Sequence, residues 1–209
     1  MEIFTYGGPI LWVLTILSVL SLAIILERLW FFKVQSTDPQ KLETALGERL
    51  YLGDHKGAAE LLMSGKSSLH RVLKVAVDHW KADSDALQIL LEQEVRRELF
   101  KLERGLSFLA VVSRIAPLLG LLGTILGMID VFRNLPGFSG ANMAMMAEGI
   151  WKALITTVAG LSLAIPVILS LTYLQSKVED MEETLSRGVD FIIREKLLGR
   201  GENVEGQNS

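Results

Sequence analysis

The stretch that decides the fold is Arg114–Phe132, which reads RIAPLLGLLGTILGMIDVF. Within it Ile115–Ile129 carries no charged residue, and the blocks Ile3–Leu26 and Ala153–Ser176 carry none over 24 residues each. A helix needs about 20 apolar residues to cross a bilayer. The chain still holds 21 Lys and Arg and 24 Asp and Glu, so its charge is confined to the other segments. This segregation excludes an ordinary water-soluble enzyme and predicts an integral membrane protein with three spans.

The residues that flank the first span predict its orientation. Residues 1–9 contain no Lys or Arg, whereas Arg28 and Lys33 follow the uncharged block. Basic residues favour the cytoplasmic side of a membrane. A basic segment before the apolar block and a small-residue cleavage pattern after it, both expected of a signal peptide, are missing. We therefore expect a retained span with the amino terminus outside and, after three spans, the carboxyl terminus inside.

The polar segment after the first span is predicted to be helical. Asp38 followed by Pro39 is typical of a helix start, and Gly53 and Gly65 are typical stops. Two short helices before Gly65 therefore form a predicted helical hairpin. From Ser84 onward, leucine and valine recur every three or four residues, which predicts one long helix that continues through the second span to about Asn134.

These patterns define the fold class and the domain organisation. We expect an all-α integral membrane protein with three transmembrane helices, of which helices 2 and 3 extend into a cytoplasmic helical bundle. The predicted segments are an N-terminal transmembrane helix at 1–33, a cytoplasmic helical region at 34–104, transmembrane helices 2 and 3 at 105–176, and a cytoplasmic segment at 177–209. This last segment is predicted to be a helix followed by a disordered tail that begins at Gly199.

Small residues lie along one face of each of the last two spans. A stripe of this kind allows close helix approach, and it serves either packing within one chain or the lining of a lumen. Both interpretations stay open from the pattern alone. Pro117 and Pro166 each remove an intrahelical hydrogen bond, which protein surroundings tolerate. The stripes comprise Gly120, Thr124 and Gly127, with Gly123 and Gly127 as a GxxxG pair, in the second span, and Ala153, Thr157, Gly160 and Ala164 in the third.

The spans contain no carboxylate at mid-membrane depth. Asp130 and Glu148 belong near the outer ends, and Arg114 near the cytoplasmic headgroups. A proton relay needs a titratable group at depth. If the chain takes part in proton movement, the carboxylate must come from a partner, with Thr124 and Thr157 as hydrogen-bonding neighbours.

Composition argues against several other functions. The net charge of −3 gives no electrostatic case for nucleic-acid binding. The chain has no Cys, and its three His residues are dispersed without the spacing of a metal pair. Neither a nucleophile–base pair nor a phosphate-binding loop is evident. We therefore predict that the protein is not an enzyme and uses no metal or cofactor.

The second-span motif, followed after a short linker by EGIWKALITTVAGLSLAIPVIL at 148–169, resembles the MotA/TolQ/ExbB proton-channel family, on its ExbB/TolQ side. The resemblance implies a homo-oligomer, specifically a pentamer, in the cell inner membrane. It implies that the lumen holds an ExbD/TolR-like single-span partner whose aspartate takes up protons. It further implies that the complex works on a TonB/TolA-like protein, coupling the proton motive force to transport of biopolymers or iron carriers.

Residue by residue, the resemblance makes Thr124 and Thr157 pore-facing. Pro117 and Pro166 match the family's prolines. Where the family usually carries glutamate this chain has Lys152, and Glu148 lies one turn earlier, so both are candidates for the pore entrance. A second interpretation, from a different class, is a non-conducting oligomeric membrane scaffold that uses the same small-residue faces.

Overall fold

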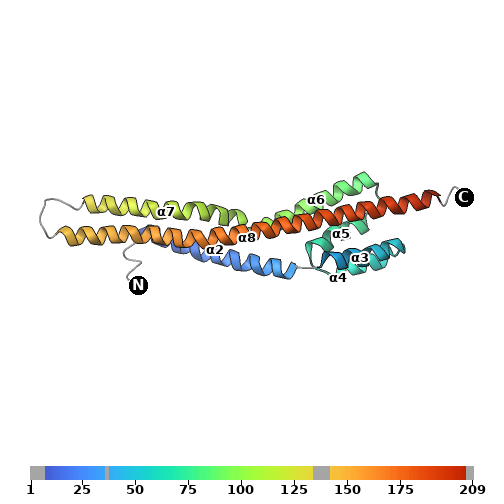
Figure 1. Cartoon of the computed structure of the whole chain (residues 1–209), viewed down its shortest axis with the longest axis horizontal. Helices are drawn as coiled ribbons and strands as arrows, with labels where there is room; N and C mark the ends of the chain where they lie inside the picture. Colours follow the sequence, from blue (N-terminus) through green and yellow to red (C-terminus); the bar gives the residue numbers. More distant parts are fainter. Residues whose placement is uncertain (1–7, 36–37, 134–141, 206–209) are drawn as a thin grey trace. The chain divides into compact units, whose positions relative to one another are not determined.

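A computed structural model describes residues 8–35, 38–133 and 142–205 (Figure 1). Within these ranges the chain consists of helices and short connections, with no strand. Three of the helices are long and apolar enough to cross a membrane, so the predicted all-α membrane fold is confirmed. The helices are α2 (Gly8–Gln35), α3 (Pro39–Tyr51), α4 (His55–Ser64), α5 (Ser68–Asp78), α6 (Ser84–Glu103), α7 (Leu106–Arg133) and α8 (Asn142–Glu205).

The short helices start and stop at the residues that the sequence indicated. The Asp38 carboxylate accepts hydrogen bonds from the backbone N–H groups of Gln40 and Lys41, at 3.2 and 3.5 Å, and so caps α3. Gly53 lies in the connection between α3 and α4 and adopts a φ of +71°, a conformation that favours glycine. Asp54 and Ser67 cap α4 and α5 in the same way as Asp38 caps α3.

The prediction of one helix from Ser84 to about Asn134 is wrong. The chain forms two helices, α6 and α7, separated at Arg104 and Gly105. Gly105 has a φ of +84°, a backbone conformation that side chains with a Cβ rarely adopt, so the helix cannot continue through it. The apolar stripe nevertheless crosses the break, because Leu102 and Leu106 are both buried. Helix 2 is therefore not itself extended beyond the span.

The tail predicted from Gly199 covers the end of helix α8 and the residues after it. Helix α8 continues to Glu205, and residues 206–209 lie outside the described chain. Once a helix is established, each further residue adds a backbone hydrogen bond without a new nucleation step. Helix α8 thus holds 64 residues and includes the whole third uncharged block.

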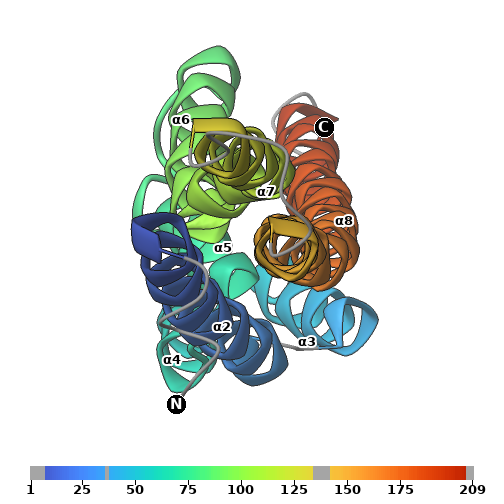
Figure 2. The same ribbon diagram turned by 90° about the vertical axis from the view of Figure 1, so that its left-hand side faces the viewer.

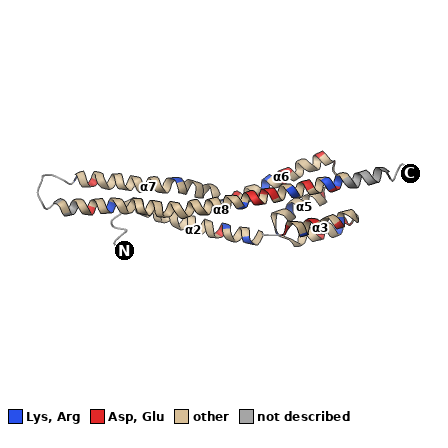
Figure 3. Cartoon of the chain, in the orientation of Figure 1, with Lys and Arg blue, Asp and Glu red and all other residues tan. Residues whose placement is uncertain are grey.

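The chain divides into two compact units. The described part of unit 1 comprises residues 8–29, 105–133 and 142–174. Its large apolar side chains point outward, as at Leu118 and Leu121 of α7 and at Val158 and Ile165 of α8. Charged residues are sparse along α7 and along the first half of α8 (Figure 3). Such an apolar exterior suits a lipid environment, where outward-facing leucine has no cost.

Unit 2 has the opposite arrangement, with charge outside and a leucine-rich core inside. It contains residues 30–35, 38–104 and 175–205 of the described chain. Leu46, Leu73 and Leu91 are buried on α3, α5 and α6, and Leu185 of α8 joins the same core. Helix α8 approaches α3 closely, because a Cβ on Gly47 would lie 3.2 Å from the Phe191 ring. Unit 2 is therefore organised like a water-exposed helical bundle.

Candidate functional site

The candidate site of unit 1 is the interface between α7 and the first half of α8, which lie side by side (Figures 1 and 2). Glycine permits their close approach. A Cβ on Gly160 would lie 2.5 Å from the carbonyl oxygen of Ala116 and 3.0 Å from the Cα of Gly120. A Cβ on Gly120 would lie 3.0 Å from the carbonyl oxygen of Thr156. The two backbones are therefore in direct contact at this level.

The GxxxG pair of α7 faces the same interface. A Cβ on Gly123 would lie 2.7 Å from the Cβ of Thr156, and one on Gly127 would lie 2.8 Å from the Cβ of Ala153. Both distances are too short for real side chains, so neither position accepts a larger residue without a shift of the helices. Ala164 continues the contact stripe and is almost fully buried.

Threonine hydroxyls occupy the centre of the interface. The Oγ1 atoms of Thr124 and Thr157 hydrogen-bond to each other across it. Thr157 Oγ1 also donates to the Gly120 carbonyl at 3.1 Å, while Thr124 Oγ1 lies 3.2 Å from that carbonyl and 3.3 Å from the Ala153 carbonyl. Each hydroxyl carries one proton and can both donate and accept. The pair can therefore rearrange its hydrogen bonds among several acceptors.

Thr124 and Thr157 are half-buried residues, whereas Thr156 beside them is buried. Thr156 Oγ1 donates to the Ala153 carbonyl at 2.7 Å and fills the space left by Gly123. Thr156 was not among the residues that the sequence analysis singled out. The signal for its buried position is the spacing of three and four residues that links Ala153, Thr156 and Gly160.

The remaining predicted residues lie outside this contact. Lys152 and Glu148 form an ion pair of 2.7 Å one helical turn apart on α8, with both side chains partly exposed. Pro117 and Pro166 lie inside α7 and α8, which continue through them as helices. Among the described residues, no group of three or more His, Asp or Glu could hold a metal ion.

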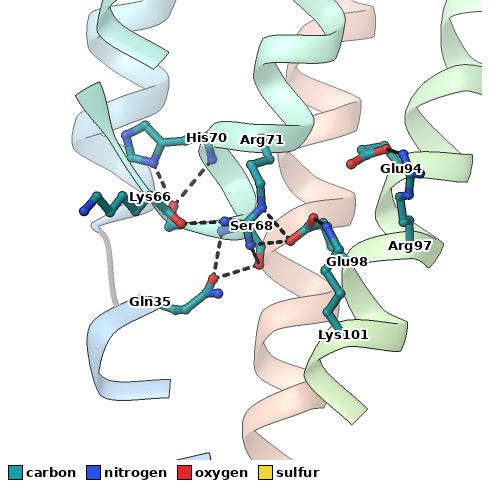
Figure 4. A network of polar contacts seen from close by, with 10 residues as sticks. Gln35, Lys66, Ser68, His70, Arg71, Glu94, Arg97, Glu98 and Lys101 are labelled. Carbon is teal, nitrogen blue, oxygen red and sulfur yellow. Dashed lines mark hydrogen bonds and ion pairs between the residues drawn. The ribbon is translucent and has the colours of Figure 1, made fainter. Parts of the chain in front are cut away.

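Unit 2 contains a second cluster, a polar network that sequence reasoning did not predict (Figure 4). Glu98 of α6 is fully buried and accepts hydrogen bonds from Arg71 Nε at 2.9 Å and from Lys101. Arg71 also donates to Ser68 Oγ at 3.1 Å, and Ser68 donates to Gln35 Oε1 through both its N–H and its hydroxyl, at 2.9 and 2.8 Å. The network therefore connects α6 and α5 to the last residue of α2.

The position of Glu98 in the sequence carried a signal. It falls between Val95 and Leu102 on the leucine stripe of α6, where an apolar residue is expected. Burial alone would raise the pKa of Glu98, but the hydrogen bonds from Arg71 and Lys101 outweigh it and lower that pKa. Glu98 is therefore an ionised carboxylate held inside the bundle.

Acidification should weaken unit 2 through His70, which is buried next to this network. Burial, with the nearby charge of Arg71, lowers the pKa of His70 below its ordinary value of 6.5. The neutral ring is favoured in the folded state, so its contribution is complete above pH 6.5 and is lost as the pH falls through the lowered pKa. Thermal unfolding followed by circular dichroism should show this loss of stability as the pH is lowered from about 7.

The matched variants for this test are His70→Asn and His79→Asn. His70→Asn should flatten the pH dependence, because the titrating group is removed while a hydrogen-bonding side chain stays near Ser67. His79 is exposed, so His79→Asn should leave the profile of the parent protein unchanged. Identical profiles for all three proteins would contradict the assignment.

Two features define the class of this protein: three helices able to span a membrane, and a glycine- and threonine-rich contact between the second and third of them. The protein is an integral membrane protein. The model of the MotA/TolQ/ExbB proton channel family matches residues 64–187, which is more than half of the chain. The chain belongs to this family, and the ExbB/TolQ-like prediction is confirmed.

Individual relatives agree with this assignment. A Synechocystis sp. protein named "Putative biopolymer transport protein ExbB-like 1" is 30% identical over 203 residues, 93% of this chain and 79% of the relative. The Vibrio cholerae biopolymer transport protein exbB1 is 31% identical over 169 residues, covering 77% of this chain and 72% of the relative. The Haemophilus influenzae Tol-Pal system protein TolQ is 31% identical over 134 residues, 64% of this chain and 59% of the relative.

Proposed function

We propose that this chain is the channel and stator subunit of a proton-driven complex that performs work at the outer membrane. Family membership supports the channel role, and relatives named for biopolymer transport and for the Tol-Pal system support energisation of the TonB or Tol type. In this proposal a pentamer encloses an ExbD/TolR-like single-span partner and acts on a TonB/TolA-like protein. No catalytic residue is assigned.

The proposed topology places unit 1 in the inner membrane. The segments 1–33 and 105–176 supply the three spans, with the amino terminus periplasmic, and 34–104 and 177–209 lie in the cytoplasm. The apolar exterior of unit 1 and the charged exterior of unit 2 support this arrangement. Lys152 and Glu148 then lie at the outer pore entrance, where their ion pair leaves little net charge.

The observation that carries the proposal is the Thr124–Thr157 hydroxyl pair in an otherwise uncharged segment. Neither hydroxyl can store a proton, and the three uncharged blocks contain no acidic residue. Thr124 and Thr157 are only half-buried within the chain, which leaves part of each residue open to a neighbouring helix. In the proposed mechanism they hydrogen-bond to the carboxylate of the partner's span and hold it in position while it gains and loses a proton.

Threonine-to-valine substitutions test this role, because valine has nearly the shape of threonine without the hydroxyl. Thr124→Val and Thr157→Val should leave assembly intact and impair proton-coupled function. Loss of one hydrogen bond to a buried carboxylate changes its energy by about 1–3 kcal/mol, or about one to two pKa units. The measurement is activity driven by a pH gradient in cells that co-express the partner, with assembly checked by native mass spectrometry.

Thr156→Val is the matched control on the same helix. Its hydroxyl is buried against the chain's own backbone, so its loss should reduce stability by about 1 kcal/mol without a specific effect on proton coupling. Full activity of the Thr124→Val/Thr157→Val double variant at normal assembly would show that these residues only pack the helices.

The non-conducting scaffold remains the second candidate, and one observation favours it. The glycines of the two stripes are used for contact between α7 and α8 within a single chain, which a scaffold needs as much as a channel does. Proton flux separates the two functions. Liposomes that contain this chain together with its single-span partner should acidify under an imposed gradient if the protein is a channel subunit, and should not if it is a scaffold.

A further inference from the structure

Helix α8 carries a row of exposed acidic side chains in unit 2 (Figure 3). Glu182 and Glu183 follow Glu179 by three and four residues, so all three lie on one face of the helix. All three are exposed, and within the part of the chain that the structure describes none of them forms an ion pair. Like charges at this spacing repel each other and destabilise a helix. This acidic ridge therefore favours a cation from outside the chain.

Helix α6 carries a row of opposite charge, the basic ridge, made of Arg96, Arg97 and Phe100. The two arginine side chains are 79% and 73% exposed, and Phe100 is 77% exposed. Each arginine already has a carboxylate of its own helix nearby, Glu92 at 3.9 Å from Arg96 and Glu94 at 3.6 Å from Arg97. Both distances are too long for a hydrogen bond. Since a guanidinium has five N–H donors, both arginines can bind further carboxylates.

Helices α6 and α8 run antiparallel within unit 2, and two contacts show how they are aligned. Lys196 Nζ of α8 donates to the carbonyl oxygens of Trp80, at 2.9 Å, and of Ala82, just before α6 begins. Further along α6, Gln88 lines one groove together with Val189 of α8. Residue numbers therefore rise along α6 as they fall along the neighbouring part of α8.

This alignment places the two ridges at the same height along α8. Arg96 lies fourteen residues after Ala82, and Glu182 lies fourteen residues before Lys196. Because helices share one rise per residue, Arg96 and Glu182 are level to within about one turn. Among the residues that the structure describes, no ion pair joins one ridge to the other. The chain therefore presents two surfaces of opposite charge at one height, and it does not pair them with each other.

We propose that the basic ridge on α6 of one copy of the chain binds the acidic ridge on α8 of the next copy. This inference rests on the proposed homo-oligomer and names a surface through which its copies meet. A rotation about an axis parallel to α8 leaves every residue at its own height, so ridges that are level within one chain are level between neighbours. Each copy offers one ridge to each neighbour. The same contact therefore repeats around a closed ring.

A second copy fits the two ridges better than an anionic membrane surface does. Anionic lipid would attract the arginines of α6, but it would repel the carboxylates of α8 at the same height. A second copy satisfies both signs, and the contact also covers the exposed ring of Phe100. Exposed ion pairs contribute little affinity one by one, so the ridges determine mainly which surfaces meet and in which register.

Crosslinking between two differently tagged full-length chains tests the contact, since the sequence has no Cys of its own. One chain carries Gln93→Cys, beside the basic ridge, and the other carries Ser186→Cys, beside the acidic ridge. Both positions are exposed and uncharged, so the ridges stay intact. After co-expression and treatment with a short bismaleimide, we expect the mixed-tag dimer in about tenfold excess over either same-tag dimer, because equal positions do not meet in a head-to-tail contact. Glu60→Cys on α4, combined with Ser186→Cys, is the control and should give little mixed-tag dimer.

Charge reversal tests the chemistry of the same contact. Arg96→Glu/Arg97→Glu in both chains should lower the mixed-tag yield about tenfold, and adding Glu182→Arg/Glu183→Arg should restore it. Salt at 1 M should also lower the yield of the parent pair, because the Debye length falls to about 3 Å.

Three results would overturn the proposal. The first is an oligomer, shown by native mass spectrometry, whose Gln93→Cys and Ser186→Cys chains do not crosslink or whose yield ignores the charge reversal; the proposed function would then still stand. The second is a yield in lipid nanodiscs that depends on phosphatidylglycerol and not on the ridge charges, because α6 would then bind the membrane. The third is a monomeric parent protein, which would overturn the proposed homo-oligomer as well.

Discussion

Gly160→Leu should separate α7 from α8 and lower the free energy of unfolding by about 3 kcal/mol or more. A Cβ at this position would already lie 2.5 Å from the Ala116 carbonyl oxygen and 3.0 Å from the Gly120 Cα, and both obstacles are backbone atoms. A flexible side chain could rotate away, but backbone cannot, so the helices themselves must move. Their movement would also break the Thr124–Thr157 hydrogen bond.

Ser162→Leu is the control for this variant. Ser162 lies two residues further along α8 and is exposed, so a leucine there adds the same apolar volume without contact with α7. Thermal unfolding in detergent, followed by circular dichroism, compares the two proteins. Equal stability of Gly160→Leu and Ser162→Leu would mean that the close contact of α7 and α8 does not contribute to the fold.

Glu98→Leu should destabilise unit 2 by about 2–3 kcal/mol. Leucine fits the apolar stripe of α6, but it leaves the Arg71 guanidinium without the carboxylate that accepts two of its N–H groups. Removal of one partner from a fully buried pair costs about 3–5 kcal/mol, and the partial exposure of Arg71, at 37%, lets water recover some of that loss. The same guanidinium donates to Ser68 Oγ, and that hydrogen bond should loosen as well.

Glu92→Leu provides the comparison on the same helix. The Glu92 side chain is 49% exposed and lies 3.9 Å from Arg96, so its removal should change stability by less than about 0.5 kcal/mol. Hydrogen exchange adds a local measurement, in which Glu98→Leu should raise exchange at the start of α5. If Glu98→Leu were as stable as Glu92→Leu, the polar network around Glu98 would not contribute to the stability of unit 2.

Local sequence was sufficient for most helix boundaries, because each depends on residues close to it. Asp38, Asp54 and Ser67 cap their helices within three residues of themselves. The break at Gly105 was not predicted, because the leucine stripe continues across it and a glycine inside a periodic pattern is compatible with a helix. Only the positive φ shows that this glycine separates α6 from α7.

The candidate site shows the same division. Spacing placed Thr124 and Gly127 on one face of the second span, and Thr157 and Gly160 on one face of the third, but it left open whether those faces meet each other. The structure brings them together and shows Thr156, not Thr157, as the most buried hydroxyl. The side chains that pack against a glycine belong to the other helix. The periodicity of one helix therefore could not predict which face of its neighbour packs there.

The sequence by itself determined that this is a membrane protein of the MotA/TolQ/ExbB family, since hydrophobic block length and the two motifs are properties of contiguous residues. Tertiary structure alone decided the contacts among residues distant in sequence. Gly120 and Gly160 are forty positions apart, Gln35 and Ser68 thirty-three, and Arg71 and Glu98 twenty-seven. These contacts arise because burial and hydrogen bonding select one three-dimensional arrangement of helices from the many that the same periodicities allow.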